Sequence, residues 1–323
     1  MGNIFSHILQ RARFHYQYRL FLKQWNVGIV KGDIREIIRS KKFDRDICWL
    51  PVNGPDHQQA DPFFLQRENG TYELLIEDVV TRDGYGKIAW VQMDKHFRRT
   101  GHAIVLDTES HLSYPYIFRD NGKVYLFPES SEAGKLSCYT YDPVTRSAAF
   151  AGDILDLPLL DTNVIRWKGK YWIIGVTREK GGENYELQCF FSRHLTGPYT
   201  AHPGNPLLTG LDGTRAAGNF IEVDGEWYRP AQNCREEYGK SISIYRVKRL
   251  DETGFEQEFH MQVEIDKKNR THRGMRAIHT INVMDDLIAV DGVRWTFSPL
   301  HQHREVMEEK ARFRESEKKQ SAG

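Results

Sequence analysis

Apolar and polar positions alternate along the chain in short runs, and pairs of these runs are separated by brief polar turns. In residues 60–77, two apolar runs flank Asn69 and Gly70. An Asn-Gly pair tolerates the positive φ angles of a tight hairpin turn, so the pattern predicts two antiparallel strands. Such a hairpin would bring Asp61, near the start of the first strand, close to Glu77 at the end of the second.

The hairpin pattern occurs five times in the sequence. Its copies cover residues 60–77, 113–129, 161–177, 217–230 and 278–291, with turns at 70, 122, 169, 225 and 286. A repeat of roughly fifty residues with strands inside each copy is typical of propeller blades and not of helical solenoids. We therefore predict an all-β fold, a five-bladed β-propeller that covers residues 25–300.

The two ends of the sequence differ from the repeats. Residues 25–30 alternate like a strand, and we expect them to complete the last blade by pairing with residues 293–297. Residues 1–24 mix basic and apolar side chains at helical spacing, which predicts a short helical segment packed on the propeller; peripheral contact with a membrane is the alternative. Residues 301–323 are rich in Arg, Glu and Lys and are interpreted as a charged helical or disordered tail.

Composition excludes several classes of protein. The 45 basic and 44 acidic residues give a net charge of +1, so nothing global attracts nucleic acid. The four cysteines lack the spacing of a zinc site or a disulfide scaffold and are predicted to be free thiols. No apolar run is long enough to span a bilayer, and the N-terminus lacks a signal peptide's apolar core. We expect a cytoplasmic protein, with the inner membrane face as an alternative location.

The sequence also offers two weak metal patterns. Asp44 and Asp46 form a DxD sequence of the kind that holds a metal in many nucleotide-sugar transferases, but three-residue patterns occur often by chance. His301 and His303 have no third ligand near them and fall in the charged tail. We predict neither a metal nor a cofactor.

Aligned copies of the hairpin place a different side chain at each equivalent position near one mouth of the channel. These positions are Asp61, Tyr114, Asp161, Gly218 or Asn219, and His279, with Glu77 and Glu129 at the ends of partner strands. Making or breaking a glycosidic bond uses one carboxylate as base or nucleophile and another as acid, and neighbouring anions raise each other's pKa. The alternative is that these aspartates only cap strands. Because the residues differ between copies, we favour a site in which Asp61, Glu129 and Asp161 are catalytic.

Other polar residues near this mouth are predicted to bind substrate. His111, Tyr114 and His279 can bond sugar hydroxyls, as can Glu77 and Asn219. Three arginines, Arg215, Arg229 and Arg276, are candidates for holding a phosphate or diphosphate through bidentate bonds. Surface salt bridges are the alternative for each arginine. The expected partner is a carbohydrate or sugar phosphate.

Five short motifs resemble a known family. They are Trp25-Asn26-Val27-Gly28-Ile29, Ala60-Asp61-Pro62-Phe63, His111-Leu112-Ser113-Tyr114-Pro115-Tyr116, Phe127-Pro128-Glu129-Ser130 and Leu160-Asp161-Thr162. Together they resemble the N-terminal domain of glucosamine inositolphosphorylceramide transferases and its single-domain bacterial relatives, over residues 25–295. That domain is similar in fold to the five-bladed propellers of glycoside hydrolase family 43 and of the levansucrase and invertase group. The resemblance implies a carbohydrate ligand.

The resemblance also implies roles for individual residues. The hydrolase group uses a base aspartate in the first blade, matched here by Asp61, and a third-blade aspartate that tunes the acid, matched by Asp161. Its glutamate acid has two candidates, because Glu129 has the better motif and Glu222 lies in the fourth repeat. The plant transferases carry a second, metal-dependent nucleotide-sugar domain after the propeller, which this sequence does not include.

Three functions follow as hypotheses. The first is a glycosyltransferase-like enzyme of cell-surface glycan or glycolipid biosynthesis, with Asp61 as base and with Arg215 and Arg276 holding a phosphate-bearing substrate. The second is a glycoside hydrolase that uses the same carboxylates. The third is a sugar-binding propeller without catalysis.

Overall fold

The predicted hairpins form, and each is closed by a tight turn with left-handed backbone. The computed structural model describes residues 21–52, 54, 56–68, 70–81 and 83–297. Gly70, Gly122, Gly169 and Gly225 have φ angles between 75° and 78°, and in the fifth hairpin Asp285 takes a φ of 55°. Positive φ is what a two-residue hairpin turn requires, so the five predicted turn positions are confirmed.

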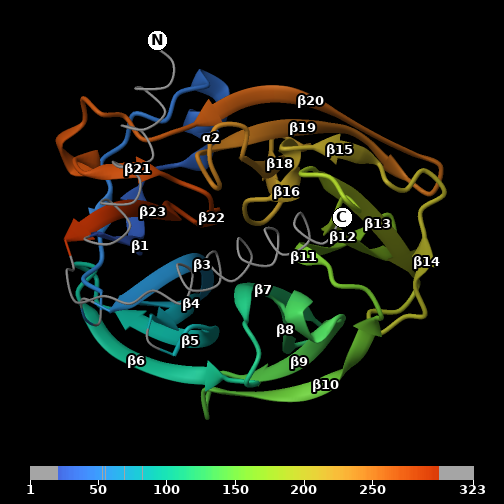
Figure 1. Ribbon diagram of the computed structural model, residues 1–323, viewed down its shortest axis with the longest axis horizontal. Helices are drawn as coiled ribbons and strands as arrows, with labels where there is room; N and C mark the ends of the chain where they lie inside the picture. Colours follow the sequence, from blue (N-terminus) through green and yellow to red (C-terminus); the bar gives the residue numbers. More distant parts are fainter. Residues whose placement is uncertain (1–20, 53, 55, 69, 82, 298–323) are drawn as a thin grey trace, which may run out of the picture.

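Five antiparallel sheets surround a central axis and make a five-bladed propeller (Figure 1). The all-β prediction is therefore confirmed. Blade one contains β3 (His57–Glu68), β4 (Thr71–Val80), β5 (Gly86–Met93) and β6 (Arg99–Leu106), and blade two contains β7 (Ser113–Asp120), β8 (Lys123–Glu129), β9 (Leu136–Asp142) and β10 (Ser147–Leu155). Blade three contains β11 (Leu160–Trp167), β12 (Lys170–Arg178), β13 (Tyr185–Ser192), β14 (Thr200–Ala201) and β15 (Leu208–Gly210). Blade four contains β16 (Asp212–Ala216), β17 (Ile221–Val223), β18 (Glu226–Asn233), β19 (Ser241–Asp251) and β20 (Gly254–Val263).

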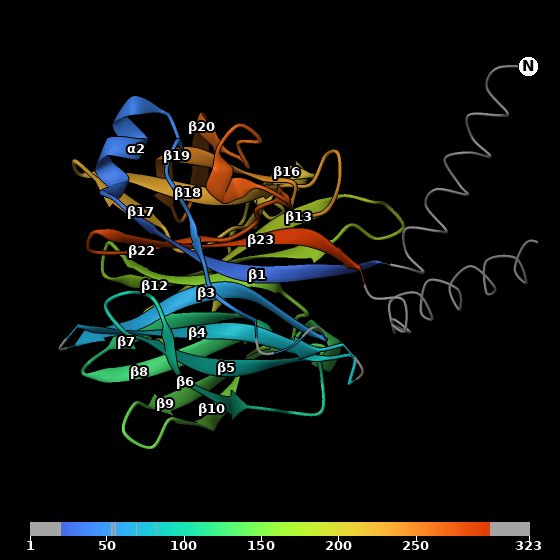
Figure 2. The same cartoon turned by 90° about the vertical axis from the view of Figure 1, so that its left-hand side faces the viewer.

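The fifth blade closes the ring with strands from both ends of the described chain. It contains β21 (Met275–Ala277), β22 (Ile281–Met284), β23 (Leu287–Phe297), β1 (Phe21–Lys31) and β2 (Cys48–Trp49). The antiparallel pairing of β1 with β23 runs from Phe21 opposite Phe297 to Lys31 opposite Leu287, and Figure 2 shows the two strands side by side. The predicted closure is confirmed, with Trp25 opposite Val293.

Three features depart from the sequence-based picture. Residues 21–24, predicted to be helical, belong to β1, because they pair with the end of β23. The helix α2 (Ile34–Ser40) begins after Asp33, whose carboxylate accepts a hydrogen bond from the Arg35 backbone amide, and it buries Ile34, Ile37 and Ile38. Single-turn 3-10 helices occupy Ser131–Ala133 and Arg270–His272. Residues 1–20 and 301–323, with their expected helix and tail, lie outside the described residues.

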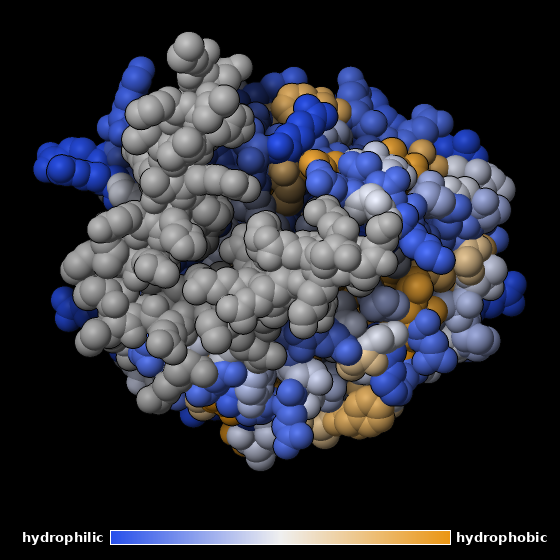
Figure 3. Space-filling view, in the orientation of Figure 1, coloured by the Kyte–Doolittle hydropathy of each residue, from blue (hydrophilic) through white to orange (hydrophobic). Residues whose placement is uncertain are grey.

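Apolar side chains fill the spaces between adjacent blades. Val30, Ile38 and Ile47 pack with blade-four and blade-five residues such as Ile244 and Ile288, all of them buried. The described part of the surface in Figure 3 is mostly hydrophilic, with apolar residues in small separate areas. Within the described ranges, α2 is the one α-helix, and no helix has the length and hydropathy needed to cross a bilayer.

Candidate functional site

The first strands of blades one, two and three share a distorted position near one end of the channel. Asp61, Tyr114 and Asp161 have φ angles of 50°, 44° and 42°, and each lies where the pairing register shifts. A non-glycine residue in this conformation stores strain of about 1–3 kcal/mol, and a bulge redirects the side chain it carries. Blade four has Gly218 there, with a φ of 128°, and a Cβ on it would lie 1.9 Å from the Ile281 carbonyl oxygen.

Side chains from all five blades line a cavity of about 480 Å³ at this end, which we call the Asp61 cavity. Its charged and polar lining includes Asp61, Glu77, His111, Ser113, Glu129, Ser131, Glu132, Arg178, Arg215 and His279, and its aromatic lining is Trp25, Tyr185 and Tyr238. The size is within the usual range for small-molecule sites.

One side of the cavity is built around a buried arginine. Arg215 on β16 bonds both carboxylate oxygens of Asp161, through Nε to Oδ2 and through Nη2 to Oδ1 at 3.3 Å, and it lies 3.5 Å from Oε2 of Glu129. Gln232 donates a 2.8 Å hydrogen bond to Asp161, and the Asp161 backbone amide donates to Glu129 at 3.3 Å. The Arg215 guanidinium also lies over the ring of Tyr238, 5.0 Å from its centre. This cation is therefore already neutralised by protein carboxylates.

The other side of the cavity is built around Asp291, which is fully buried. Its Oδ1 accepts hydrogen bonds from the backbone amides of His279 and Thr280, at 3.0 and 2.9 Å. Its Oδ2 accepts from the Asp61 amide at 3.0 Å and lies 2.6 Å from Nδ1 of His279. Asp61 in turn accepts from the Thr280 hydroxyl at 2.6 Å and from the Tyr114 amide at 3.1 Å. Carboxylates thus fasten consecutive blades to one another.

Burial and neighbouring charges shift the ionisation of these groups. Burial raises the pKa of Asp61 to about 7, against the pull of His279 and with added repulsion from Glu77 and Asp291. Burial also raises the pKa of Asp161 to about 7, although Arg215 opposes the shift. For His279, burial disfavours the cation, but Asp291 and Asp61 outweigh it and raise its pKa to about 9. The cavity therefore holds a cationic histidine beside two carboxyls that exchange protons near neutral pH.

The rim adds a second histidine–carboxylate pair and an aromatic wall. Nε2 of His111 lies 3.2 Å from Glu77; burial lowers its pKa, but the bond to Glu77 and the charge of that residue raise it overall to about 9. Trp25 stacks on His279 with ring centres 4.0 Å apart, and the edge of Tyr238 contacts the same imidazole. Charged groups beside flat apolar surfaces suit a ligand with hydroxyl groups and a ring.

Asp61, His279 and Asp291 are the one group of potential metal ligands that lie close enough together, among the residues that the structure describes. Their oxygens do not fit a cation well, because Asp291 already accepts three backbone hydrogen bonds and contacts the imidazole. The raised pKa of His279 further favours a protonated ring, in which neither nitrogen has a lone pair free to bind a metal.

Comparison with known proteins identifies the chain's relatives. Residues 51–291 match the family described as glucosamine inositolphosphorylceramide transferase 1, N-terminal. The chain belongs to this family.

Members of the transferase N-terminal family include plant proteins of much greater length. Glucosamine inositolphosphorylceramide transferase 1 of Arabidopsis thaliana is 31% identical over 311 residues, which is 88% of this chain and 40% of the plant protein. The protein of the same name from Oryza sativa subsp. japonica is 28% identical over 241 residues, which is 72% of this chain and 32% of the rice protein. The chain thus spans less than half of these relatives.

Solved structures with the same fold are more distant in sequence. A family 117 glycoside hydrolase from Zobellia galactanivorans has a TM-score of 0.53 at 13% identity, covering 88% of this chain and 97% of the hydrolase. A β-1,2-mannobiose phosphorylase from Listeria innocua has a TM-score of 0.51 at 11% identity, covering 76% and 92%. At this identity the likeness supports the propeller fold alone.

In this family member, most of the predicted site residues meet in one place. The Asp61 cavity is lined by Asp61, Glu77, His111, Glu129, Arg215 and His279, and Asp161 lies behind it, bonded to Arg215. Arg215 was predicted to hold a phosphate, but it is not open to one. Its guanidinium already bonds Asp161 and approaches Glu129.

Four predicted binding residues do not line the Asp61 cavity. Tyr114 is fully buried and its hydroxyl bonds the Gly218 backbone across the channel. Arg229 is also fully buried and donates to the carbonyls of Gly213 and Thr214. Arg276 is exposed, whereas Met275 and Ala277 on either side of it in β21 are buried. Because side chains alternate along a strand, Arg276 points away from the interior.

The fourth residue, Asn219, lines a cavity at the other end of the channel, together with Glu222. Glu222 is therefore not a partner for Asp61, which leaves Glu129 as the candidate glutamate acid. The strand β17 carries Glu222 toward the hairpin turn and away from the bulge, as its pairing with Trp227 shows.

Several residues of the site were not predicted from the sequence. Gln232 follows the turn at Gly225 by the same interval as Glu77 follows Gly70 and Glu129 follows Gly122, so extending the same alignment to blade four would have found it. Asp291 lies closer to its turn and within β23, so the alignment does not single it out. Trp25 and Tyr238 come from outside the repeated hairpins, so the repeat pattern carries no signal for them.

Proposed function

We propose that the Asp61 cavity binds a carbohydrate and that its carboxyl groups perform acid–base chemistry at a glycosidic bond. The observation that carries the proposal is the presence, around one cavity, of Asp61 and Asp161 with pKa values raised to about 7, together with Glu129. A general acid or base works best when its pKa is close to the ambient pH, and glycosidic chemistry needs one of each.

Each residue would have its own role in the reaction. Asp61 in its ionised form accepts the proton of the attacking hydroxyl group, and Glu129 supplies a proton to the departing oxygen. Arg215 holds Asp161 and Glu129 in place and sets their charge through its bonds to both. Trp25 and Tyr238 provide apolar surface for the sugar ring.

Sugar transfer is the first candidate reaction, because the plant relatives are named as glucosamine inositolphosphorylceramide transferases. A reaction without a nucleotide donor is the second candidate. It is favoured by the state of Arg215, a buried cation of the cavity, whose guanidinium already bonds Asp161 and so is not open to a diphosphate. Hydrolysis of a glycoside fits that second possibility.

The test begins with a thermal-shift screen of the whole chain against nucleotide sugars, sugar phosphates and neutral oligosaccharides. A ligand that binds only the folded state raises the melting temperature. Stabilisation by a nucleotide sugar favours transfer, whereas stabilisation only by oligosaccharides, with release of reducing sugar, favours hydrolysis.

Turnover of the stabilising ligand is then compared in wild type, Asp61→Asn and Glu129→Gln. Asp224→Asn is the matched control, because Asp224 lies in an exposed turn and forms an exposed ion pair with Arg39. We expect both site variants to lose at least about a hundredfold in rate, in line with loss of a general acid or base, and the control to retain its rate. Equal turnover in Asp61→Asn would contradict the proposal, and binding without turnover in any form would leave a sugar-binding propeller.

A further inference from the structure

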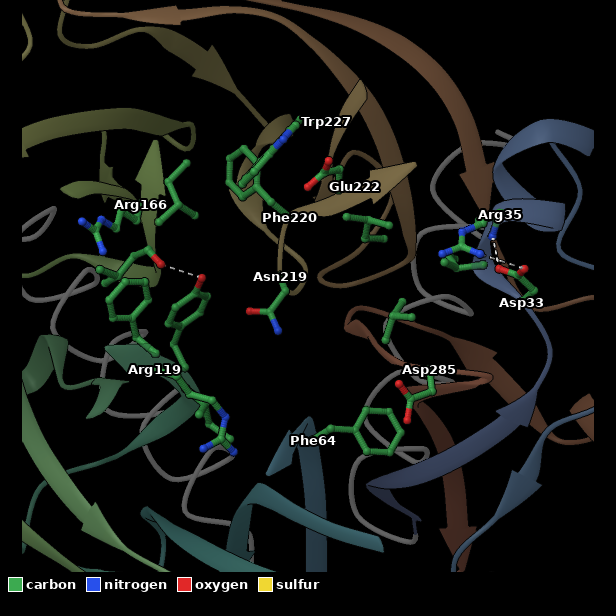
Figure 4. Close-up of a pocket in the computed structure, with 18 of the residues that line it drawn as sticks. Asp33, Arg35, Phe64, Arg119, Arg166, Asn219, Phe220, Glu222, Trp227 and Asp285 are labelled. Carbon is green, nitrogen blue, oxygen red and sulfur yellow. Dashed lines mark hydrogen bonds and ion pairs between the residues drawn. The ribbon is translucent and has the colours of Figure 1, made fainter. Parts of the chain in front are cut away.

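A second cavity, of about 830 Å³, lies at the end of the channel where the hairpin turns gather. We call it the Asn219 cavity. Its lining includes Asp33, Arg35, Phe64, Arg119, Arg166, Asn219, Phe220, Glu222, Trp227, Asp285 and Asp286. Figure 4 shows Asn219 near its centre, between Phe220 and Phe64, with Arg119 and Arg166 on one side.

The two cavities are separated by a plug of side chains inside the channel. The Tyr114 hydroxyl accepts a hydrogen bond from the Gly218 amide at 2.9 Å and donates to the Gly218 carbonyl at 3.1 Å. Asn163 donates to the same carbonyl at 2.9 Å, and the Phe63 ring meets the ring of Tyr114 edge-on. All of these side chains are fully buried, so a ligand in one cavity does not reach the other.

Most charges around the Asn219 cavity are already paired. Asp285 and Asp286 face Arg67, at 3.6 and 2.6 Å, and Arg35 lies 3.9 Å from Asp33. Arg166 lies 3.8 Å from Asp120, which is not part of the lining. Arg119 differs, because within the described chain its one hydrogen-bond partner is the neutral Leu65 carbonyl. Its positive charge is therefore not balanced by a carboxylate.

The side-chain amide of Asn219 is the second unusual feature. Its backbone amide donates to Asn282 at 2.8 Å, but no hydrogen bond to its side chain exists among the residues that the structure describes. Oδ1 is shielded from solvent and has no donor. The Asn219 side chain nevertheless lies on the cavity lining, so its amide group can hydrogen-bond a hydroxyl group of a ligand there.

Aromatic rings complete the wall. Phe220 and Trp227 contact each other with ring centres 5.8 Å apart, and both are partly exposed, as is Phe64. Glu222 lies opposite Trp227 in the pairing of β17 with β18, and it is exposed on the same lining. The cavity thus offers apolar faces, an amide and a carboxylate that accepts hydrogen bonds, and one unbalanced cation.

We propose that the Asn219 cavity is a second ligand site, which binds a monosaccharide carrying one anionic group, with the anion at Arg119 and the sugar hydroxyls at Asn219 and Glu222. The apolar face of the sugar ring packs against Phe220 and Trp227, and the guanidinium bonds the phosphate or carboxylate oxygens. This site is distinct from the Asp61 cavity and does not depend on the reaction proposed there.

Calorimetric titration of the whole chain tests the proposal. Glucose 6-phosphate and glucuronate are the two probes, since they carry the anion as phosphate or carboxylate; glucose and inorganic phosphate are the reference compounds. We expect one or both anionic sugars to bind more tightly than either reference compound. Arg119→Met should weaken that binding at least about tenfold, Arg119→Lys less, and Asn219→Ala several-fold.

Two control variants locate the binding. Arg193→Met, on an exposed loop of blade three, and Asp61→Asn should leave the dissociation constant unchanged. Loss of binding in Asp61→Asn with retention in Arg119→Met would place the sugar in the Asp61 cavity and overturn the proposal. Equal binding of neutral glucose, or the absence of saturable heat with both anionic probes up to about 10 mM, would overturn it as well. Because the Asn219 side chain bonds no other described residue, its alanine variant should fold normally and remain informative if Arg119→Met does not.

Discussion

The two ends of the channel use charge in opposite ways. In the Asp61 cavity, carboxylates that are at least nine-tenths buried fasten one blade to the next and contact a buried arginine and histidine. Around the Asn219 cavity, the ion pairs of Arg35 with Asp33 and of Arg67 with Asp285 and Asp286 are exposed to solvent. Asp286 on the lining of the larger cavity has a lowered pKa, because Arg67 bonds it, whereas Asp61 on the lining of the smaller one has a raised pKa, because it is buried. Cavity size alone does not locate the chemistry in this fold.

The difference follows from the geometry of the blades. At the end with Asp61, bulges with positive φ turn side chains into the narrow part of the channel, where water is excluded. At the other end, two-residue turns project outward, so their side chains remain hydrated. Desolvation is the largest cause of the raised pKa values of Asp61 and Asp161, which is why both occur at one end.

The largest effect on stability is expected for Asp291→Ala. This change leaves a cationic His279 without its carboxylate and the Asp61, His279 and Thr280 amides without their acceptor. Removing one partner of a buried ion pair typically costs about 3–5 kcal/mol, measured here by denaturant unfolding. Asp291→Asn, which retains an acceptor oxygen, should lose less. A loss below about 1 kcal/mol for the alanine variant would show that the carboxylate does not fasten the blades.

The second prediction concerns pH. The pKa of Asp61 rises from 3.8 to about 7 on folding, so the folded protein retains a proton that the unfolded chain releases between these values. The protonated Asp61 therefore stabilises the folded protein relative to its ionised form. This contribution to the free energy of unfolding is present below about pH 4 and is lost as the pH rises to 7. Asp61→Asn should therefore gain stability relative to wild type between pH 4 and 8, on the order of 2–4 kcal/mol.

Unfolding of both proteins at pH 4, 6 and 8 gives the comparison. Using the difference between wild type and variant cancels the titration of exposed carboxylates such as Asp94, Asp224 and Asp286, whose lowered pKa values act at more acidic pH. Parallel pH profiles would mean that Asp61 titrates normally.

A smaller loss is expected for Tyr114→Phe, which removes the hydroxyl that bonds the plug to Gly218. The Gly218 amide would lose its acceptor inside a fully buried site, at a cost of about 1–3 kcal/mol. Tyr125→Phe is the matched control, since its hydroxyl has no hydrogen-bond partner in the described ranges. Equal midpoints of denaturation for both variants would contradict the role of the Tyr114 hydroxyl.

The smallest effect is expected at the turns. Arg39→Ala and Arg67→Ala remove ion pairs to Asp224 and to Asp285 and Asp286, and all of these side chains are exposed. Solvent screens such pairs, so we expect no resolvable change in melting temperature. A clear decrease would show that the turn end also depends on charge for its stability.

The repeated hairpin carried most of the information about the fold. A short polar turn between two alternating apolar runs recurs in every blade, with Gly at the turn of the first four, because each blade has the same core to fill. Turns, blade number and ring closure were therefore predictable. Helix α2 was not predicted, because it is an insertion between β1 and β2 outside the repeat. The alignment of the five hairpins predicted the location of those site residues that lie near the bulge of the first strand, as for Asp61, Asp161 and His279.

The direction of individual side chains was less predictable. Gly218 and Asn219 are adjacent in sequence, yet one faces the Tyr114 plug and the other lines the Asn219 cavity. Arg229 follows a turn like a surface residue but is buried against backbone carbonyls. These outcomes depend on strand breaks in blade four, where β16 ends at Ala216 and β17 begins at Ile221, and the repeat pattern does not show such breaks.

The most direct test of the account is an NMR titration of the aspartate carboxyl carbons in wild type and Asp61→Asn. The account predicts a carboxyl signal that is absent from the variant and titrates with an apparent pKa near 7, with a second one that belongs to Asp161. It also predicts that the Asp161 signal moves in the variant, since the two carboxyls repel each other. If every aspartate signal instead titrates below about pH 5, the Asp61 cavity has no carboxyl poised for acid–base chemistry at neutral pH, and the central claim is wrong.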